Sequence, residues 1–239
     1  MKKFKGLFVM MLCTLLLVGC STKEEQNTNS KEQNNNSKEQ VKIETNGDVY
    51  QSNMPAEEKD ILKNIDVKFE KAESGQYVMF ITNNNTFAIP ELEISVNFYK
   101  DGKIVDTTKD GHDAILPGYT VVSDFDSYES FDDAKYDLEL DWSNSYKNHS
   151  DNVKVDYNIN SSKDVLVTVT NNNDYEIEEI EVIVVFYNKD GKLLGTSYAK
   201  DIYDVAAGKS KTESLYLKEY SMKNQIDSVK IYMNQAHTF

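Results

Sequence analysis

The chain has 239 residues, of which 40 are acidic and 26 are basic, so its formal net charge at pH 7 is −14. A chain this acidic repels nucleic acid and anionic lipid, which argues against a role on either. Its partners are expected to be basic, cationic or neutral. The alternative is that the acidic composition only keeps the protein soluble.

The N-terminus has the features of a bacterial export signal. Lysines at positions 2, 3 and 5 precede an apolar run over 7–18, which is too short to span a bilayer as a helix. The run ends in Leu17-Val18-Gly19-Cys20, which resembles the lipobox of bacterial lipoproteins. The resemblance implies that a diacylglycerol modifies Cys20 and that Cys20 becomes the mature N-terminus. An ordinary signal peptide, or an uncleaved anchor with an incidental cysteine, is the alternative.

The cysteines agree with a lipid-anchored protein. If the lipobox resemblance holds, Cys13 is removed with the leader and Cys20 is lipidated, so no thiol would remain for a disulfide, a metal or a nucleophile. The leader carries three lysines and no acid, so its removal makes the chain more negative still. Acyl chains, at about 0.8 kcal/mol per buried methylene, and not charge, would hold the protein at the extracytoplasmic face of the cell membrane.

A polar stretch follows Cys20. Residues 21–40 contain no apolar side chain and repeat the unit SKEQ, so they cannot bury enough surface to offset their chain entropy. We expect a disordered tether with a typical reach of roughly 25 Å. Residues 41–65 form a lead-in, in which Pro55–Leu62 is compatible with either a short helix or an irregular segment.

The rest of the chain is an internal repeat. The segments YVMFITNNNTFAIPELEISVNFY (77–99) and VLVTVTNNNDYEIEEIEVIVVFY (165–187) are identical at ten of 23 positions, and Asp-Gly-Lys follows each. Apolar residues alternate in both copies, which is typical of half-buried strands. In the second copy Ile183 and Val185 make the other face apolar too, so that strand is expected to be covered on both sides. The repeated asparagines, the Asp-Gly pairs and the two glycines Gly118 and Gly208 are typical of turns. The alternative is that the repeated asparagines form a ligand site in each copy.

These patterns predict an all-β protein with two tandem immunoglobulin-like antiparallel β-sandwiches after the signal peptide and the disordered linker. The expected segments are a signal peptide (1–19), the lipidated cysteine and tether (20–40), the lead-in (41–65), a first sandwich (66–146) and a second sandwich (147–239). The strings ISVNFYKDGKIV with ILPG, and VIVVFYNKDGKLLG with the Gly208 turn, resemble the FxLyD domain. That family is a small sandwich of exported bacterial and archaeal proteins, and the resemblance implies a binding or spacer role without catalytic residues.

The sequence offers no recognisable catalytic site. His112, His149 and His237 are too far apart in sequence for metal-ligand spacing, and we expect them in exposed loops. No nucleophile elbow, zinc motif or nucleotide-binding loop is present, so we expect neither an enzyme nor a cofactor. Eight carboxylates between Asp124 and Asp141 form either a solvated acidic rim or a weak calcium site.

Tyrosine is in excess, with fifteen in the chain. Four gather in each copy, at Tyr119, Tyr128, Tyr136 and Tyr146, and at Tyr198, Tyr203, Tyr216 and Tyr220. Tyrosines either seal the ends of a sandwich core or form a binding surface. The sequence therefore favours a lipid-anchored protein-interaction or spacer module of the envelope, with a ligand-binding lipoprotein for a cell-wall glycan, peptide or cation as the alternative. A flat apolar patch would favour the first and a deep aromatic cavity the second.

Overall fold

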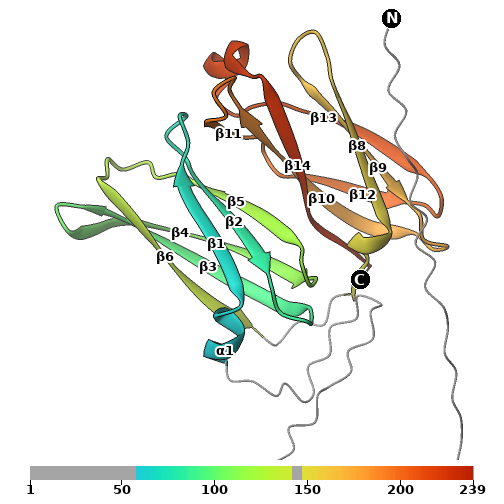
Figure 1. The fold of residues 1–239 in the computed structure, drawn as a ribbon, viewed down its shortest axis with the longest axis horizontal. Helices are drawn as coiled ribbons and strands as arrows, with labels where there is room; N and C mark the ends of the chain where they lie inside the picture. Colours follow the sequence, from blue (N-terminus) through green and yellow to red (C-terminus); the bar gives the residue numbers. More distant parts are fainter. Residues whose placement is uncertain (1–57, 142–146, 239) are drawn as a thin grey trace, which may run out of the picture. The chain divides into compact units, whose positions relative to one another are not determined.

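The computed structural model describes residues 58–141 and 147–238 (Figure 1). The leader, Cys20, the tether and most of the lead-in lie outside the described residues, as do Trp142 and Tyr146. Within the described part the regular secondary structure is almost wholly antiparallel strands, which confirms the all-β prediction. Its helices are short, and none of them is long and apolar enough to cross a membrane.

The first sandwich consists of two three-stranded antiparallel sheets, with strand orders β1-β2-β5 and β4-β3-β6. The strands are β1 (Ile65–Lys71), β2 (Tyr77–Asn83), β3 (Ile89–Lys100), β4 (Lys103–Ile115), β5 (Thr120–Phe125) and β6 (Asp133–Asp141). Met79 and Ile81 of one sheet meet Leu92, Ile94 and Phe98 of the other in one buried cluster. The apolar alternation along β3 therefore marks the face that points into the core.

A short helix, α1 (Glu58–Leu62), closes one end of this sandwich. It forms in the lead-in, where a helix and an irregular segment were both compatible with the sequence. Ile61 is 1% exposed and joins the core cluster together with Ile65, where β1 begins. The core of the first sandwich thus begins within the lead-in segment, upstream of residue 66.

The second sandwich repeats this plan, with strand order β8-β9-β13 in one sheet and β10 between β14 and the pair β11 and β12 in the other. The strands are β7 (Lys147–Asn148), β8 (Val153–Ile159), β9 (Val165–Asn171), β10 (Ile177–Tyr187), β11 (Leu193–Thr196), β12 (Lys200–Val205), β13 (Ser210–Leu215) and β14 (Ser228–Thr238). Two 3-10 helices, η1 (Ser150–Asn152) and η2 (Tyr220–Gln225), precede β8 and β14. The core again lies between the sheets, around Val167, Val182 and Phe186.

The two copies differ after the central strand. In the first, Asp101 and Gly102 have φ values of 50° and 73° and form a two-residue hairpin turn, as their sequence predicts. In the second, one extra residue lengthens the turn, and the Asn188 side chain accepts hydrogen bonds from the backbone N–H groups of Asp190 and Lys192. The single strand β4 is then matched by two shorter strands, β11 and β12, with Ser197–Ala199 between them.

The repeated TNNN segments hold the same buried structure in both copies. Asn83 and Asn171 are each 0% exposed. The Asn83 Nδ2 donates to the carbonyl oxygens of Phe87 and Ile115, at 2.9 and 2.8 Å, and its Oδ1 accepts from the backbone and side chain of Asn85. Asn171 makes the corresponding bonds to Tyr175, Val205 and Asn173. The repeated asparagines are thus structural turn residues whose side chains saturate buried backbone groups.

Candidate functional site

The face of β10 that points away from its own core is covered by the first sandwich. The described residues of both sandwiches fall within one compact unit. Ile183 and Val185 form a buried cluster with Val78, Phe80 and Val122 of the first copy. Each of these five side chains is at most 8% exposed. The apolar second face that the sequence shows in β10 is therefore an inter-sandwich interface.

Backbone hydrogen bonds extend this interface. The turn between β1 and β2 lies against β11, where the N–H groups of Glu73 and Ser74 donate to the carbonyls of Leu193 and Leu194, at 2.9 and 3.1 Å. Gly195 allows this approach, because its φ is +149° and a Cβ there would lie 2.8 Å from the Gln76 Oε1. The first copy thus covers part of the free edge of β11.

Asp124, the first carboxylate of the acidic segment, belongs to this interface. It forms an ion pair with Lys218 of the second sandwich, and the two side chains are only 12% and 19% exposed. Its Oδ2 also accepts hydrogen bonds from Thr196 Oγ1 at 2.9 Å and from Gln76 Nε2 at 2.8 Å. One carboxylate thereby links the two copies through a saturated polar network.

The rest of the acidic segment does not converge on a site. Asp137 and Glu139 point to solvent from β6, as the outward face predicted, and Asp132 accepts from the backbone N–H of Asp101. Within 58–141 and 147–238, no three His, Cys, Asp or Glu side chains gather as metal ligands. The arrangement therefore favours the interpretation as an acidic rim over the calcium site.

We expect Asp124→Ala to lower the free energy of unfolding by about 3 kcal/mol, because it leaves the largely buried Lys218 ammonium without its counter-charge. Denaturant titration checks the value. The matched control is Asp137→Ala, an exposed carboxylate of the same segment, which should change stability by no more than about 0.5 kcal/mol. Calcium should leave the melting temperature unchanged, and a rise would restore the metal-site interpretation.

The histidine prediction is wrong, since all three are buried rather than in exposed loops. His112, His149 and His237 are 5%, 7% and 4% exposed. The His112 Nε2 lies 2.7 Å from Ser123 Oγ, and the His149 Nδ1 lies 2.7 Å from the Tyr175 hydroxyl. Burial lowers the pKa of His112 and of His237 below the ordinary value. Each imidazole finds polar neighbours in the interior, which its place in the sequence does not reveal.

Two of the four tyrosines of the second copy, Tyr198 and Tyr216, line a groove of that sandwich. Tyr198, Tyr203, Tyr216 and Tyr220 are 63%, 52%, 49% and 66% exposed, so they do not seal the core. In the first copy Tyr119 packs on the core, whereas Tyr128 is fully exposed. Sealing of the core, one of the two alternatives, thus does not describe these four tyrosines of the second copy.

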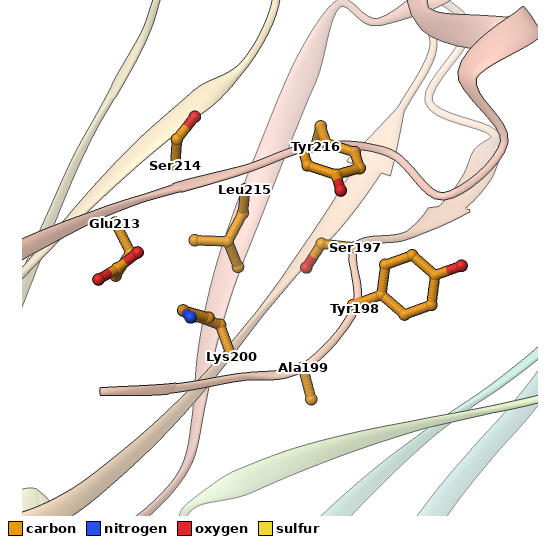
Figure 2. A pocket seen from close by; sticks show the side chains of 8 residues that line it. All are labelled: Ser197, Tyr198, Ala199, Lys200, Glu213, Ser214, Leu215 and Tyr216. Carbon is orange, nitrogen blue, oxygen red and sulfur yellow. The ribbon is translucent and has the colours of Figure 1, made fainter. Parts of the chain in front are cut away.

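The groove has a volume of about 210 Å³ and lies between two segments that belong to different sheets (Figure 2). One wall is Ser197–Lys200, and the other is Glu213–Tyr216 at the end of β13. Figure 2 shows Leu215 and Lys200 pointing into the space between the two walls, with the Tyr216 and Tyr198 rings at one end. Leu215 is buried and forms the floor.

Local backbone geometry explains why Tyr198 is exposed. Ser197 bonds to β10 twice, because its N–H donates to the Val184 carbonyl at 2.8 Å and its Oγ accepts from the Val184 N–H at 3.0 Å. The chain then leaves the sheet until β12 begins at Lys200, and Tyr198 projects from this bulge. The Lys218 ammonium lies 4.7 Å from the centre of the Tyr198 ring, so the groove adjoins the ion pair of the interface.

Two further hollows lie elsewhere. One, of about 240 Å³, is bordered by Phe80, Tyr187, Tyr232 and two lysines, Lys68 and Lys230. The other, of about 380 Å³, is mostly polar and is lined in part by Ser127 and Ser130. All three are at or below the low end of the volumes of typical small-molecule sites, about 300–1,000 Å³.

Comparison with known proteins adds no relative. No protein-family model matches the chain, and no curated protein is similar to it.

Proposed function

We propose that the chain is a lipid-anchored extracytoplasmic lipoprotein whose two sandwiches act as a non-catalytic protein-interaction module of the bacterial envelope. The basic leader and the lipobox ending in Cys20 support the anchor. The resemblance of both copies to FxLyD domains supports an exported binding or spacer role. The polar tether of residues 21–40 would hold the sandwiches away from the membrane surface.

The observation that carries the interaction role is the tyrosine-flanked groove of the second sandwich. Tyrosine is enriched among the residues that dominate binding energy in protein interfaces, and Tyr198 and Tyr216 are 63% and 49% exposed here. The strands β12 and β13 are each paired on one side only in the described structure, so backbone groups border the same groove. A shallow groove of this kind suits a protein surface better than a small ligand.

The buried contact between the copies adds to this role. Because the interface combines an apolar cluster, backbone hydrogen bonds and an ion pair, the two sandwiches are expected to move as one body. Such a pair would present the groove in a fixed orientation relative to α1, where the described part of the first sandwich begins.

The second candidate is a ligand-binding lipoprotein, which the hollow beside Phe80, Tyr187 and Tyr232 favours. Aromatic faces with hydroxyl groups suit a sugar ring or a peptide side chain. The lining includes the hydrogen-bonded pair Thr82 and Thr120, whose hydroxyl oxygens lie 2.7 Å apart. Its small volume makes it the weaker of the two candidates.

The test is co-purification from intact cells after mild cross-linking, with the full chain tagged at its C-terminus. We expect one envelope protein to be recovered in stoichiometric amount with the wild type. The double variant Tyr198→Ala/Tyr216→Ala should reduce its recovery by about tenfold or more, because each truncation removes an interface tyrosine.

The matched control is Tyr128→Ala/Tyr157→Ala, which removes two other exposed tyrosines and should leave recovery unchanged. Cys20→Ala should release the chain from the membrane. This variant therefore tests the lipid anchor independently of the groove. Equal recovery with both double variants would refute the role of the groove. Absence of any stoichiometric partner for the folded, membrane-bound wild type would refute the stable interaction module.

A further inference from the structure

Two pairs of like charges stand on neighbouring strands near the inter-sandwich interface. In the first copy Glu91 of β3 lies directly opposite Asp113 of β4. In the second copy Glu181 of β10 lies directly opposite Asp201 of β12. Like charges at opposed positions of antiparallel strands destabilise the pairing. Both sandwiches therefore carry an unfavourable carboxylate pair on a face that points outward from their own core.

The contact between the copies brings these pairs together. The charge of Glu179 in the second copy acts on Asp113 in the first, and the charge of Asp110 in the first acts on Glu181 in the second. Glu179 and Glu181 are the counterparts of Glu91 and Glu93 in the repeat. The contact thus places acidic residues of β4 in the first copy near acidic residues of β10 in the second.

Asn234 of β14 connects this acidic cluster to the edge of the first sandwich. Its Oδ1 accepts from the Val122 N–H at 2.9 Å and its Nδ2 donates to the Val122 carbonyl at 3.0 Å, so the side-chain amide pairs with β5 as a backbone residue would. The same Nδ2 donates to the Glu181 Oε1 at 2.6 Å. The protonation state of Glu181 is therefore linked directly to an inter-sandwich hydrogen bond.

Within 58–141 and 147–238, the charges that act on Glu181 and Asp113 are all negative. From the strands packed around them come Asp110 and His112 of β4, Glu91 of β3, Glu178 and Glu179 of β10, Asp201 and Tyr203 of β12, and Asn234, Gln235 and His237 of β14. Every charge that acts on the two acids is a carboxylate. His112 bonds to Ser123, and His237 lies 3.9 Å from the Glu179 Oε2.

Burial raises the pKa of Glu181 to about 7, with the neighbouring carboxylates adding to the rise and the hydrogen bond from Asn234 opposing it. Burial, Glu91 and Glu179 together raise the pKa of Asp113 to about 6. Both acids thus bind a proton more tightly when the interface is closed than when they face water. Stability from this source is complete below the ordinary pKa of each carboxyl and is lost as the pH rises through about 6 and about 7.

We propose that the contact between the two sandwiches is proton-linked, so that the pair is held closed in a mildly acidic medium and loosens as the pH rises through neutrality. The charged Asp113 then repels Glu179, and the charged Glu181 repels Asp110, across the contact. His237 acts in the opposite sense, because its pKa is lowered by burial and the open form takes up a proton first as the pH falls below 6.5. This inference goes beyond the proposed function and does not rest on the identity of a partner.

Amide hydrogen exchange of the full chain in detergent micelles tests the proposal. The Val122 N–H reports directly on opening, because its hydrogen bond is to Asn234 of the other sandwich. Its protection factor, corrected for the intrinsic exchange rate, should fall on the order of tenfold between pH 5.5 and pH 8. The N–H groups of Asn83 and Asn171 bond within their own sandwiches and should keep their protection.

The variant Glu181→Gln/Asp113→Asn should abolish the pH dependence at Val122, since glutamine can still accept the bond from Asn234. Glu139→Gln, an exposed carboxylate of β6, should leave the dependence unchanged. A Val122 protection factor that is constant with pH in the wild type overturns the proposal, whatever the variants do. The same pH dependence in the double variant would overturn the assignment to these two acids.

Discussion

Replacing Asn171 with alanine is expected to lower the free energy of unfolding by about 3 kcal/mol or more. The change removes the hydrogen-bond partner of the buried Val205 carbonyl, and of the Tyr175 carbonyl and the Asn173 backbone N–H, whose bonds are partly buried. Each buried polar group left unsatisfied costs about 1–3 kcal/mol. Urea titration followed by circular dichroism measures the loss, and Asn83→Ala should cause a loss of the same size in the first copy.

The neighbouring asparagine provides the matched control. Asn172 is exposed, so Asn172→Ala should change stability by no more than about 0.5 kcal/mol. Asn171→Asp keeps the acceptor but loses both donated bonds, and it should be nearly as destabilising as alanine. If Asn171→Ala and Asn172→Ala cost the same, the TNNN segment acts only through its turn conformation.

The strands themselves could be predicted because their apolar residues alternate. Leu92, Ile94 and Phe98 point inward and are fully buried. The role of Asn83 was not predictable from the same pattern. A TNNN segment indicates a turn, but nothing in one sequence shows which of three adjacent amides points into the core. That depends on the Phe87 and Ile115 carbonyls, one of which is 32 residues away.

The sequence indicated the inter-sandwich interface in the second copy only. Ile183 and Val185 make β10 apolar on both faces, and that signal is confirmed by the cluster with the first copy. The partner surface is Val78, Phe80 and Val122, which are spread over β2 and β5 as ordinary strand residues. The sequence placed Asp124 in an acidic segment, because seven further carboxylates follow it up to Asp141. It did not show that Asp124 pairs with Lys218, which belongs to the other copy.

The sequence predicted which residue type would line a binding surface, but not where in the fold that surface lies. The excess of tyrosine identified Tyr198 and Tyr216 as candidates. Their position at the groove results from the Ser197 bulge, where a hydroxyl accepts a bond from the β10 backbone. A serine between two strand-like segments does not by itself indicate such a break.

The second large effect is expected at the interface, where Val185→Asp should separate the sandwiches without unfolding either one. Val185 is 0% exposed, and it points away from the core of its own sandwich toward Val78 and Phe80. A carboxylate buried there without a partner costs several kcal/mol while the contact stays closed. Opening the contact hydrates the charge and leaves Val184 and Phe186 in place on the other face of β10.

Calorimetry distinguishes the outcomes, because a rigid pair is expected to melt in one transition and an uncoupled pair in two. Hydrogen exchange should show loss of protection at the Val122 N–H, which bonds across the contact, with protection retained at the Asn171 N–H. The control Ile104→Asp places the same charge at a site that is 55% exposed and should preserve the single transition. Loss of protection at Asn171 as well would mean that the second sandwich cannot hold its fold without the first. In that case the interface is part of a common core, and the two copies fold as one domain instead of as a docked pair.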